Sequence, residues 1–154
     1  MRNLSDIDLE SWKKIIDTNL TSAFLCSKEA MNIMKKQNFG RIIQISSVVG
    51  HQGALKGHIH YASSKSGQLG FTKTLARTGA PYGITANAIA PGIIKTELLY
   101  TTHGEAGVEK LTTTVPLGLG TTSDIGSAAV YLSSEEAGYV TGVTLDVNGG
   151  LYIR

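Results

Sequence analysis

A strand–loop–helix unit at residues 41–65 constrains the fold of this sequence more than any other feature. The apolar residues 42–45 predict a buried strand at 41–46, which is followed directly by the hydroxyl of Ser47. A helix is predicted at 61–78. The segment between them is a predicted loop that contains Gly50, Gly53 and Gly57. A strand that passes through a loop into a helix is typical of folds in which helices cover a sheet.

A long amphipathic helix is predicted before this unit. It begins near Asp8, with Asp6 or Asp8 as its N-cap, and ends near Asn38. A bend is expected near Thr18. The predicted apolar stripe consists of Leu9, Trp12, Ile16, Leu20, Ala23, Phe24, Met31 and Met34.

The alternation of strands and helices continues to the end of the chain. Strands are predicted at 83–90 and 142–147, and a helix capped by Ser123-Asp124 is predicted up to Ser133. The first of these strands is apolar on both faces, as in a parallel sheet covered by helices. The Thr- and Gly-rich segment 97–121 is predicted to be irregular. The order predicts an α/β fold whose parallel strands are joined by right-handed crossovers, with a sheet of about three strands.

The bulk composition limits the possible settings and partners. A chain of 154 residues is long enough for one domain. The net charge of +2 comes from interspersed signs, so neither nucleic acid nor membrane is an expected partner. Cys26 is the only cysteine, which excludes an internal disulfide and suits a reducing, cytoplasmic setting. No stretch approaches the about 18 apolar residues of a membrane span.

The residues best suited to chemistry are Ser47, Tyr61 and Lys65. Tyr61 and Lys65 are four positions apart, so they share one face of the predicted helix. A cation within about 4–6 Å of a phenol favours the phenolate, which would let a tyrosine exchange protons near neutral pH. Ser47 at the strand end could hydrogen-bond the same substrate oxygen. The alternative is a surface tyrosine and lysine that share a helix face by chance, because Y-x-x-x-K alone is common.

Other candidate residues are weaker. Asn19 lies beside the apolar stripe of the first helix, and its amide is either locally satisfied or held there for a function. The four histidines, His51, His58, His60 and His103, lie in predicted loop sequence without nearby carboxylates, so no metal site is expected. The sequence contains no G-x-x-x-G-x-G loop of the kind that holds a dinucleotide phosphate.

Five motifs together resemble the short-chain dehydrogenase/reductase family, of the 3-oxoacyl-carrier-protein reductase or sugar-alcohol dehydrogenase type. They are DTNLTSAF around Asn19, GRIIQISSVVG around Ser47, YASSK at residues 61–65, NAIAPGIIKT at residues 87–96 and the closing TGVTLDVNGG. The resemblance implies a partial Rossmann-like, doubly wound parallel sheet, the C-terminal part of a three-layer α/β/α domain. Residues 1–154 would form a single, N-terminally incomplete domain, because the family's glycine-rich cofactor loop would precede Met1.

The resemblance also implies roles for individual residues. Tyr61 would be the catalytic acid/base and Ser47 would orient the substrate. Lys65 would assist Tyr61 and bind the nicotinamide ribose, and Asn19 would hold a water behind Lys65. Besides Tyr61 and Lys65, the cofactor-binding residues would be Pro91, Gly92, Ile94 and Thr96. Segment 97–121 would be the substrate lid.

The expected function is therefore NAD- or NADP-dependent hydride transfer between nicotinamide and a secondary alcohol or ketone. The small-molecule substrate would be of the 3-oxoacyl or the polyol and sugar class, and the protein would form a homo-oligomer, a dimer or a tetramer, through its two long helices. The alternative is a truncated, catalytically inactive fragment that acts only in oligomerisation with full-length subunits. The choice between NAD and NADP stays open.

Overall fold

The computed structural model describes residues 4–54 and 58–154, so Gly57 of the predicted loop lies outside the described residues. The elements in chain order are η1 (Leu4–Asp6), α1 (Leu9–Ile16), η2 (Asp17–Thr21), α2 (Ser22–Gln37), β1 (Gly40–Ile45), α3 (Val49–Gln52), α4 (Ile59–Gly79), η3 (Ala80–Tyr82), β2 (Ile84–Pro91), α5 (Glu97–Thr112), α6 (Thr122–Ser133) and β3 (Thr144–Val147).

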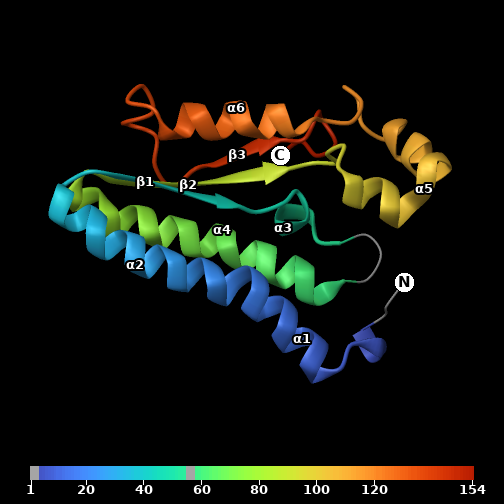
Figure 1. The fold of residues 1–154 in the computed structure, drawn as a ribbon, viewed down its shortest axis with the longest axis horizontal. Helices are drawn as coiled ribbons and strands as arrows, with labels where there is room; N and C mark the ends of the chain where they lie inside the picture. The colour runs from blue at the N-terminus through green and yellow to red at the C-terminus, as the bar shows by residue number, and fades with distance from the viewer. Residues whose placement is uncertain (1–3, 55–57) are drawn as a thin grey trace.

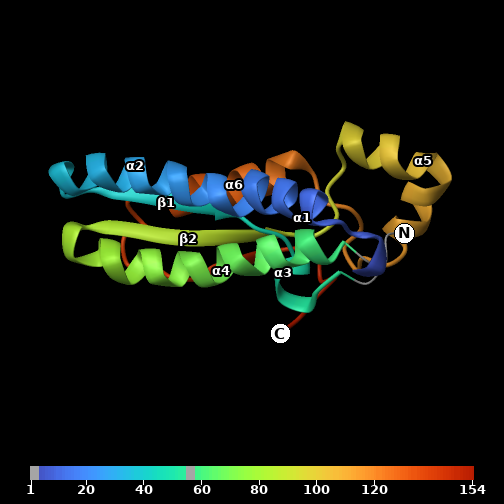
Figure 2. The ribbon, with the colours of Figure 1, turned by 90° about the horizontal axis from the view of Figure 1, so that it is seen from below.

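The three strands form one parallel sheet in the order β1-β2-β3. Gly40 of β1 is in register with Ile84 of β2, and Ala88 of β2 is in register with Thr144 of β3. Helices α2 and α4 cover one face of the sheet and α6 covers the other, while α5 lies beyond the carboxyl ends of the strands (Figures 1 and 2). The predicted α/β class, with a partial Rossmann-like parallel sheet, is confirmed.

The central strand β2 is the most buried element. Seven of its eight residues are buried, including Ile84, Ala88 and Ile89, which are at most 1% exposed. Both of its faces are therefore covered, as the apolar sequence of this strand predicted. Met31 of α2 and Ala76 of α4 pack against one end of β1 and β2 in a common apolar cluster. This core fixes the two long helices on the sheet.

The long first helix has the predicted start, bend and end. The Asp8 side chain accepts a hydrogen bond from the Ser11 backbone N–H (2.7 Å), which identifies Asp8 as the N-cap of α1. The expected bend is a π-helical segment, η2, that includes Thr18. Asn38 ends α2 in the left-handed conformation, with φ of 50°.

The predicted apolar stripe of this helix is only partly correct. Ala23 and Met31 are buried, but Leu9 is 65% exposed and Phe24 is 49% exposed. Leu9 is the first residue of α1, and Phe24 directly follows the buried Ala23, which places it about 100° around the helix from that residue.

Three further expectations were wrong. Most of segment 97–121 is not irregular but forms α5, interrupted at Gly104. The N-cap of α6 is Thr121, which forms a capping box with Asp124. The predicted glycine loop contains the one-turn helix α3, in which Gly50 is buried. The capping box of α6 is a local contact, whereas α5 is held by the packing of Val108 with Val115 and Leu119.

Candidate active site

Ser47 lies where β1 ends, at the carboxyl edge of the parallel sheet. The neighbouring Val48 donates its backbone N–H to the carbonyl of Pro91 at the end of β2 (2.9 Å). The ends of the two strands are therefore bound side by side. Ligands of open parallel α/β sheets bind at this edge, beyond the carboxyl ends of the strands.

The hydroxyl of Ser47 is buried at the start of α3. Its oxygen accepts a hydrogen bond from the Val49 N–H (3.2 Å), and its carbonyl accepts one from the Gly50 N–H (2.8 Å). Ser47 thus forms a local turn that leads into the short helix α3, whose N-cap is Val48. On the other side of α3, Ser66 of α4 donates its hydroxyl to the Gly50 carbonyl (2.7 Å), which ties α3 to α4.

Tyr61 and Lys65 lie one turn apart near the start of α4. The Lys65 Nζ is 5.8 Å from the centroid of the Tyr61 ring. The same ammonium donates to the Ile45 carbonyl (2.8 Å) and to the Oε1 of Gln68 (3.4 Å). Burial lowers the pKa of Lys65 below its usual value. The carbonyl of the last residue of β1 therefore anchors the ammonium beside the phenol.

Asn19 reaches α4 from η2. Its Nδ2 donates to the buried Ser64 hydroxyl (3.0 Å), and its backbone carbonyl accepts from the Nε2 of Gln68 (2.8 Å). Because Gln68 also accepts from Lys65, a continuous chain of hydrogen bonds joins Asn19 to the ammonium. The π-helical turn that contains Asn19 aims its backbone carbonyl at α4.

Gln68 is a residue that the sequence reasoning missed. It is 5% exposed and links the π-helical turn to Lys65. Its position three residues after Lys65 places it on the same helix face, and a buried amide needs partners. That spacing is the signal that could have identified it.

The segment after β2 passes from the strand end to α5. Gly92 donates its N–H to the Val147 carbonyl (2.9 Å), and a Cβ on Gly92 would lie 2.7 Å from the Cα of Asn148, so only glycine fits there. Ile94 pairs with Gly120, and the Thr96 hydroxyl caps α5 by accepting from Leu99. The structure therefore brings Pro91 next to the Ser47 segment, whereas Ile94 contacts the residue before the N-cap of α6 and Thr96 contacts the first turn of α5.

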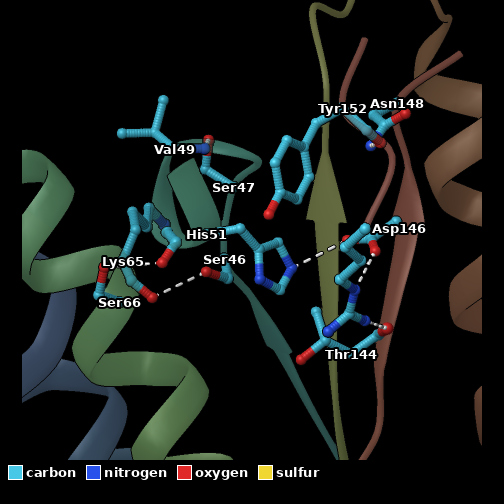
Figure 3. A network of polar contacts seen from close by, with 12 residues as sticks. Ser46, Ser47, Val49, His51, Lys65, Ser66, Thr144, Asp146, Asn148 and Tyr152 are labelled. Carbon is cyan, nitrogen blue, oxygen red and sulfur yellow. Dashed lines mark hydrogen bonds and ion pairs between the residues drawn. The ribbon is translucent and has the colours of Figure 1, made fainter. Parts of the chain in front are cut away.

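The expectation that the histidines lie far from carboxylates is wrong for His51. Its Nε2 is 2.9 Å from the Oδ1 of Asp146 on β3 (Figure 3). His58 and His60 instead stack on each other, with ring centroids 6.3 Å apart. Within residues 4–54 and 58–154, no group of three or more His, Cys, Asp or Glu side chains could hold a metal ion.

Among the helices of the described chain, none has the length and hydropathy that a membrane-spanning segment requires.

Comparison with known proteins relates almost the whole chain to reductases. The model of a family described as enoyl-(acyl carrier protein) reductase matches residues 1–152. The chain is 46% identical over 147 residues to the 3-oxoacyl-[acyl-carrier-protein] reductase of Haemophilus influenzae, and 46% identical over 145 residues to that of Vibrio cholerae. Each match covers 94% of this chain but only 59% of the relative. The chain therefore spans about three-fifths of the length of the curated relatives that it matches.

Proposed function

Because the chain belongs to the short-chain dehydrogenase/reductase family, we propose that it carries the proton-transfer site of a ketone/secondary-alcohol oxidoreductase. The observation that supports this most directly is the position of Lys65. Its ammonium is held beside the Tyr61 ring by a main-chain carbonyl and by a buried amide. A cation held beside the ring can attract the negative charge that Tyr61 would carry once it has given up its proton.

In the proposed mechanism, Tyr61 donates its phenolic proton to the carbonyl oxygen as that oxygen gains negative charge. Ser47 hydrogen-bonds the same oxygen and fixes the direction of the carbonyl. Lys65 stabilises the tyrosinate that remains. Asn19 and Gln68 hold Lys65 in place through the hydrogen bonds that join α4 to η2. The reverse sequence of proton transfers oxidises an alcohol.

A bound NAD or NADP would supply or accept the hydride. Lys65 would fit such a group, since two of its three ammonium donors are accounted for by its contacts within the described chain, and the third would be left for a ribose hydroxyl. Tyr61, Pro91, Gly92, Ile94 and Thr96 would lie along the same end. The sequence has no G-x-x-x-G-x-G loop for the pyrophosphate, and nothing on these residues selects NAD over NADP.

We propose a 3-oxoacyl substrate, because the two relatives named above are 3-oxoacyl-[acyl-carrier-protein] reductases. A polyol or sugar is the alternative, since the Thr-rich α5 offers hydroxyls as readily as apolar surface. Segment 97–121, which includes α5, is the proposed lid of the single domain 1–154. We also propose a reducing, cytoplasmic setting, in keeping with the exposed thiol of Cys26.

The test is reduction of a 3-oxoacyl thioester with saturating NADPH by the wild type and by Tyr61→Phe. Loss of the acid/base group should lower turnover by about 100-fold or more. Tyr82→Phe removes a hydroxyl from a half-exposed tyrosine after α4 and should leave the rate unchanged. Wild-type turnover in Tyr61→Phe would refute the proposal. Absence of turnover in the wild type itself would favour the second candidate function below.

The second candidate is association with full-length subunits without catalysis. It is favoured by the exposed apolar side chains of α2, where Phe24, Leu25 and Ile33 are 49%, 53% and 58% exposed. The same surface would serve a homo-oligomer. Mixing the chain with the Haemophilus influenzae reductase and recording native mass spectra tests this candidate. Spectra with only unmixed species would count against it.

A further inference from the structure

We propose that His51 and Asp146 form a positioning pair that holds α3, and with it the Ser47 hydroxyl, in a geometry that depends on the proton of His51. This inference rests on the proposed function, because it assigns a task to Ser47. It concerns a contact between α3 and β3 that none of the sequence motifs contains.

The pair is a short contact between one nitrogen of His51 and one oxygen of Asp146. The Nε2 of His51 and the Oδ1 of Asp146 are 2.9 Å apart, and their side chains are 10% and 22% exposed. Both atoms are buried, and neither makes a hydrogen bond in the part of the chain that the structure describes, so the contact between them is an ion pair when His51 is protonated. A buried polar atom that loses its partner is costly, so separation of the pair is disfavoured.

Asp146 itself is fixed from the C-terminal side. Its second oxygen accepts from the Nε of Arg154 (2.8 Å), and Arg154 also donates to the Thr144 carbonyl (2.8 Å). The ring of Tyr152 stacks on the ring of His51, with centroids 5.8 Å apart and planes 13° from parallel. The carboxylate and the tyrosine thus hold the imidazole on two sides (Figure 3).

The imidazole is connected to Ser47 by a very short path. His51 is the third residue of the four-residue helix α3, and its N–H donates to the Val48 carbonyl (3.0 Å). Ser47 is bonded to the same helix by the N–H groups of Val49 and Gly50. One turn of helix has too few hydrogen bonds to be stable alone, so its position depends on outside contacts. Figure 3 shows α3 between Lys65 and Ser66 of α4 on one side and Asp146 on the other.

The strength of the pair depends on protonation. A protonated His51 is attracted to the carboxylate as an ion pair, and a neutral His51 lacks that attraction between charges. The other charged or titratable groups in contact with the pair, within the described residues, are Arg154 and Tyr152 in the C-terminal segment, and Lys65 on α4 lies on the far side of α3 from Asp146 (Figure 3). Arg154 shares the carboxylate but binds its other oxygen, so it does not replace His51. Loss of the proton from His51 should therefore make the position of α3 less fixed, including its hydrogen bond to the Ser47 hydroxyl.

Nuclear magnetic resonance of the ¹⁵N-labelled chain tests this without any turnover. In the wild type, the amide signal of Val49, whose N–H is bound to the Ser47 Oγ, should shift with pH at the same midpoint as the His51 ring. In Asp146→Asn, which keeps the shape but removes the charge, the amplitude of that Val49 shift should fall by more than half. His51→Gln should abolish it, whereas His103→Gln on the exposed surface of α5 should leave it unchanged.

The proposal fails if the Val49 signal does not follow the His51 titration, or if Asp146→Asn leaves the amplitude unchanged. Circular dichroism shows whether each variant is folded, and Asp146→Asn remains informative if His51→Gln does not fold. For active enzyme, Asp146→Asn should lower kcat by about 10-fold, through misplacement of Ser47, with the KM for substrate within about twofold of the wild type. Normal turnover of Tyr61→Phe would refute the proposed function but would not affect the pH dependence of the Val49 signal. Failure of the proposed function and failure of the His51–Asp146 proposal are therefore distinguishable.

Discussion

At the scale of single residues, Lys65 is a cationic side chain whose burial disfavours its charged form. Burial lowers its pKa from the usual 10.5. Between the lowered pKa and 10.5, the unfolded chain therefore binds more protons at this residue than the folded chain does. The free energy of unfolding should rise with pH across that window through this group, and the rise should be complete above 10.5.

Lys65→Met should remove this contribution. The stability of the wild type relative to the variant should increase as the pH rises toward 10.5. Urea unfolding at a series of alkaline pH values measures the difference. Lys73→Met, on the exposed surface of the same helix, is the control. A pH-independent difference between wild type and Lys65→Met would contradict the prediction.

Gln68→Leu should destabilise the chain because the Gln68 amide is hydrogen-bonded both to Lys65 of α4 and to Asn19 of η2. The leucine would leave the Asn19 carbonyl and the Lys65 ammonium without a partner that they now have. An unsatisfied buried group costs about 1–3 kcal/mol, so a loss of that size in urea unfolding is expected. Gln37→Leu at the exposed end of α2 should change stability by less than about 0.5 kcal/mol. Equal stability of both variants would show that the Gln68 bonds contribute nothing.

The sequence could predict some of these residues and not others, for a physical reason. Tyr61 and Lys65 are neighbours because they are four positions apart on one helix, and helix geometry alone brings them together. His51 and Asp146 are brought together only by the packing of α3 on the end of β3. No periodicity connects two such distant positions, so that pair could not be predicted from the sequence.

At the scale of elements, the strands were predictable and α5 was not. Short apolar runs bounded by turn residues became β1 and the buried strand β2, because strands covered by helices need continuous apolar sequence. Strand β3, in which no residue is buried, was predicted from the turn residues that close it. Segment 97–112 instead contains Thr101, Thr102, Gly104 and Gly107, whose helix propensities are low. It is helical because Val108, which is 5% exposed, packs with Val115 and Leu119. Tertiary contacts overrode a weak local preference there.

The interruption of α5 at Gly104 leads to a prediction about glycine. Gly104 has φ of 63° and ψ of 170°, a conformation that is essentially restricted to glycine. A Cβ at this position would meet no atom within 4 Å, so Gly104→Ala would be opposed by the backbone and not by crowding. We expect it to destabilise the chain by about 1–3 kcal/mol.

Gly70→Ala is the matched control for this substitution. Gly70 lies in the regular helix α4 and is also free of atoms within 4 Å, so alanine there should stabilise the chain by about 0.5–1 kcal/mol. Thermal unfolding of both variants measures the two changes in stability, which should have opposite signs. A Gly104→Ala variant as stable as Gly70→Ala would mean that the break in α5 is not required.

At the scale of the whole molecule, the site residues meet because the sheet is parallel. Parallel pairing places the ends of β1 and β2 at one edge, and α4 returns along one face so that its first turn reaches the same edge (Figure 1). The predicted alternation of elements was sufficient to infer this meeting place. It was not sufficient to place α5, whose position beyond that edge depends on its packing against the segment that follows β2 and on Leu151.

The same arrangement leads to a prediction about the affinity of this chain for a dinucleotide. The nicotinamide end would be held by Tyr61, Lys65 and the segment after β2, but the 154 residues contain no glycine-rich loop for the pyrophosphate. Loss of two charge-assisted hydrogen bonds of about 1.5–3 kcal/mol each weakens binding by about 100-fold or more. Fluorescence titration with NADPH should therefore give a Kd at least about 100-fold higher for this chain than for the Haemophilus influenzae reductase. Lys65→Met should weaken the residual binding further, and Lys73→Met should not. A Kd close to that of the relative would show that this chain holds the phosphates by other residues.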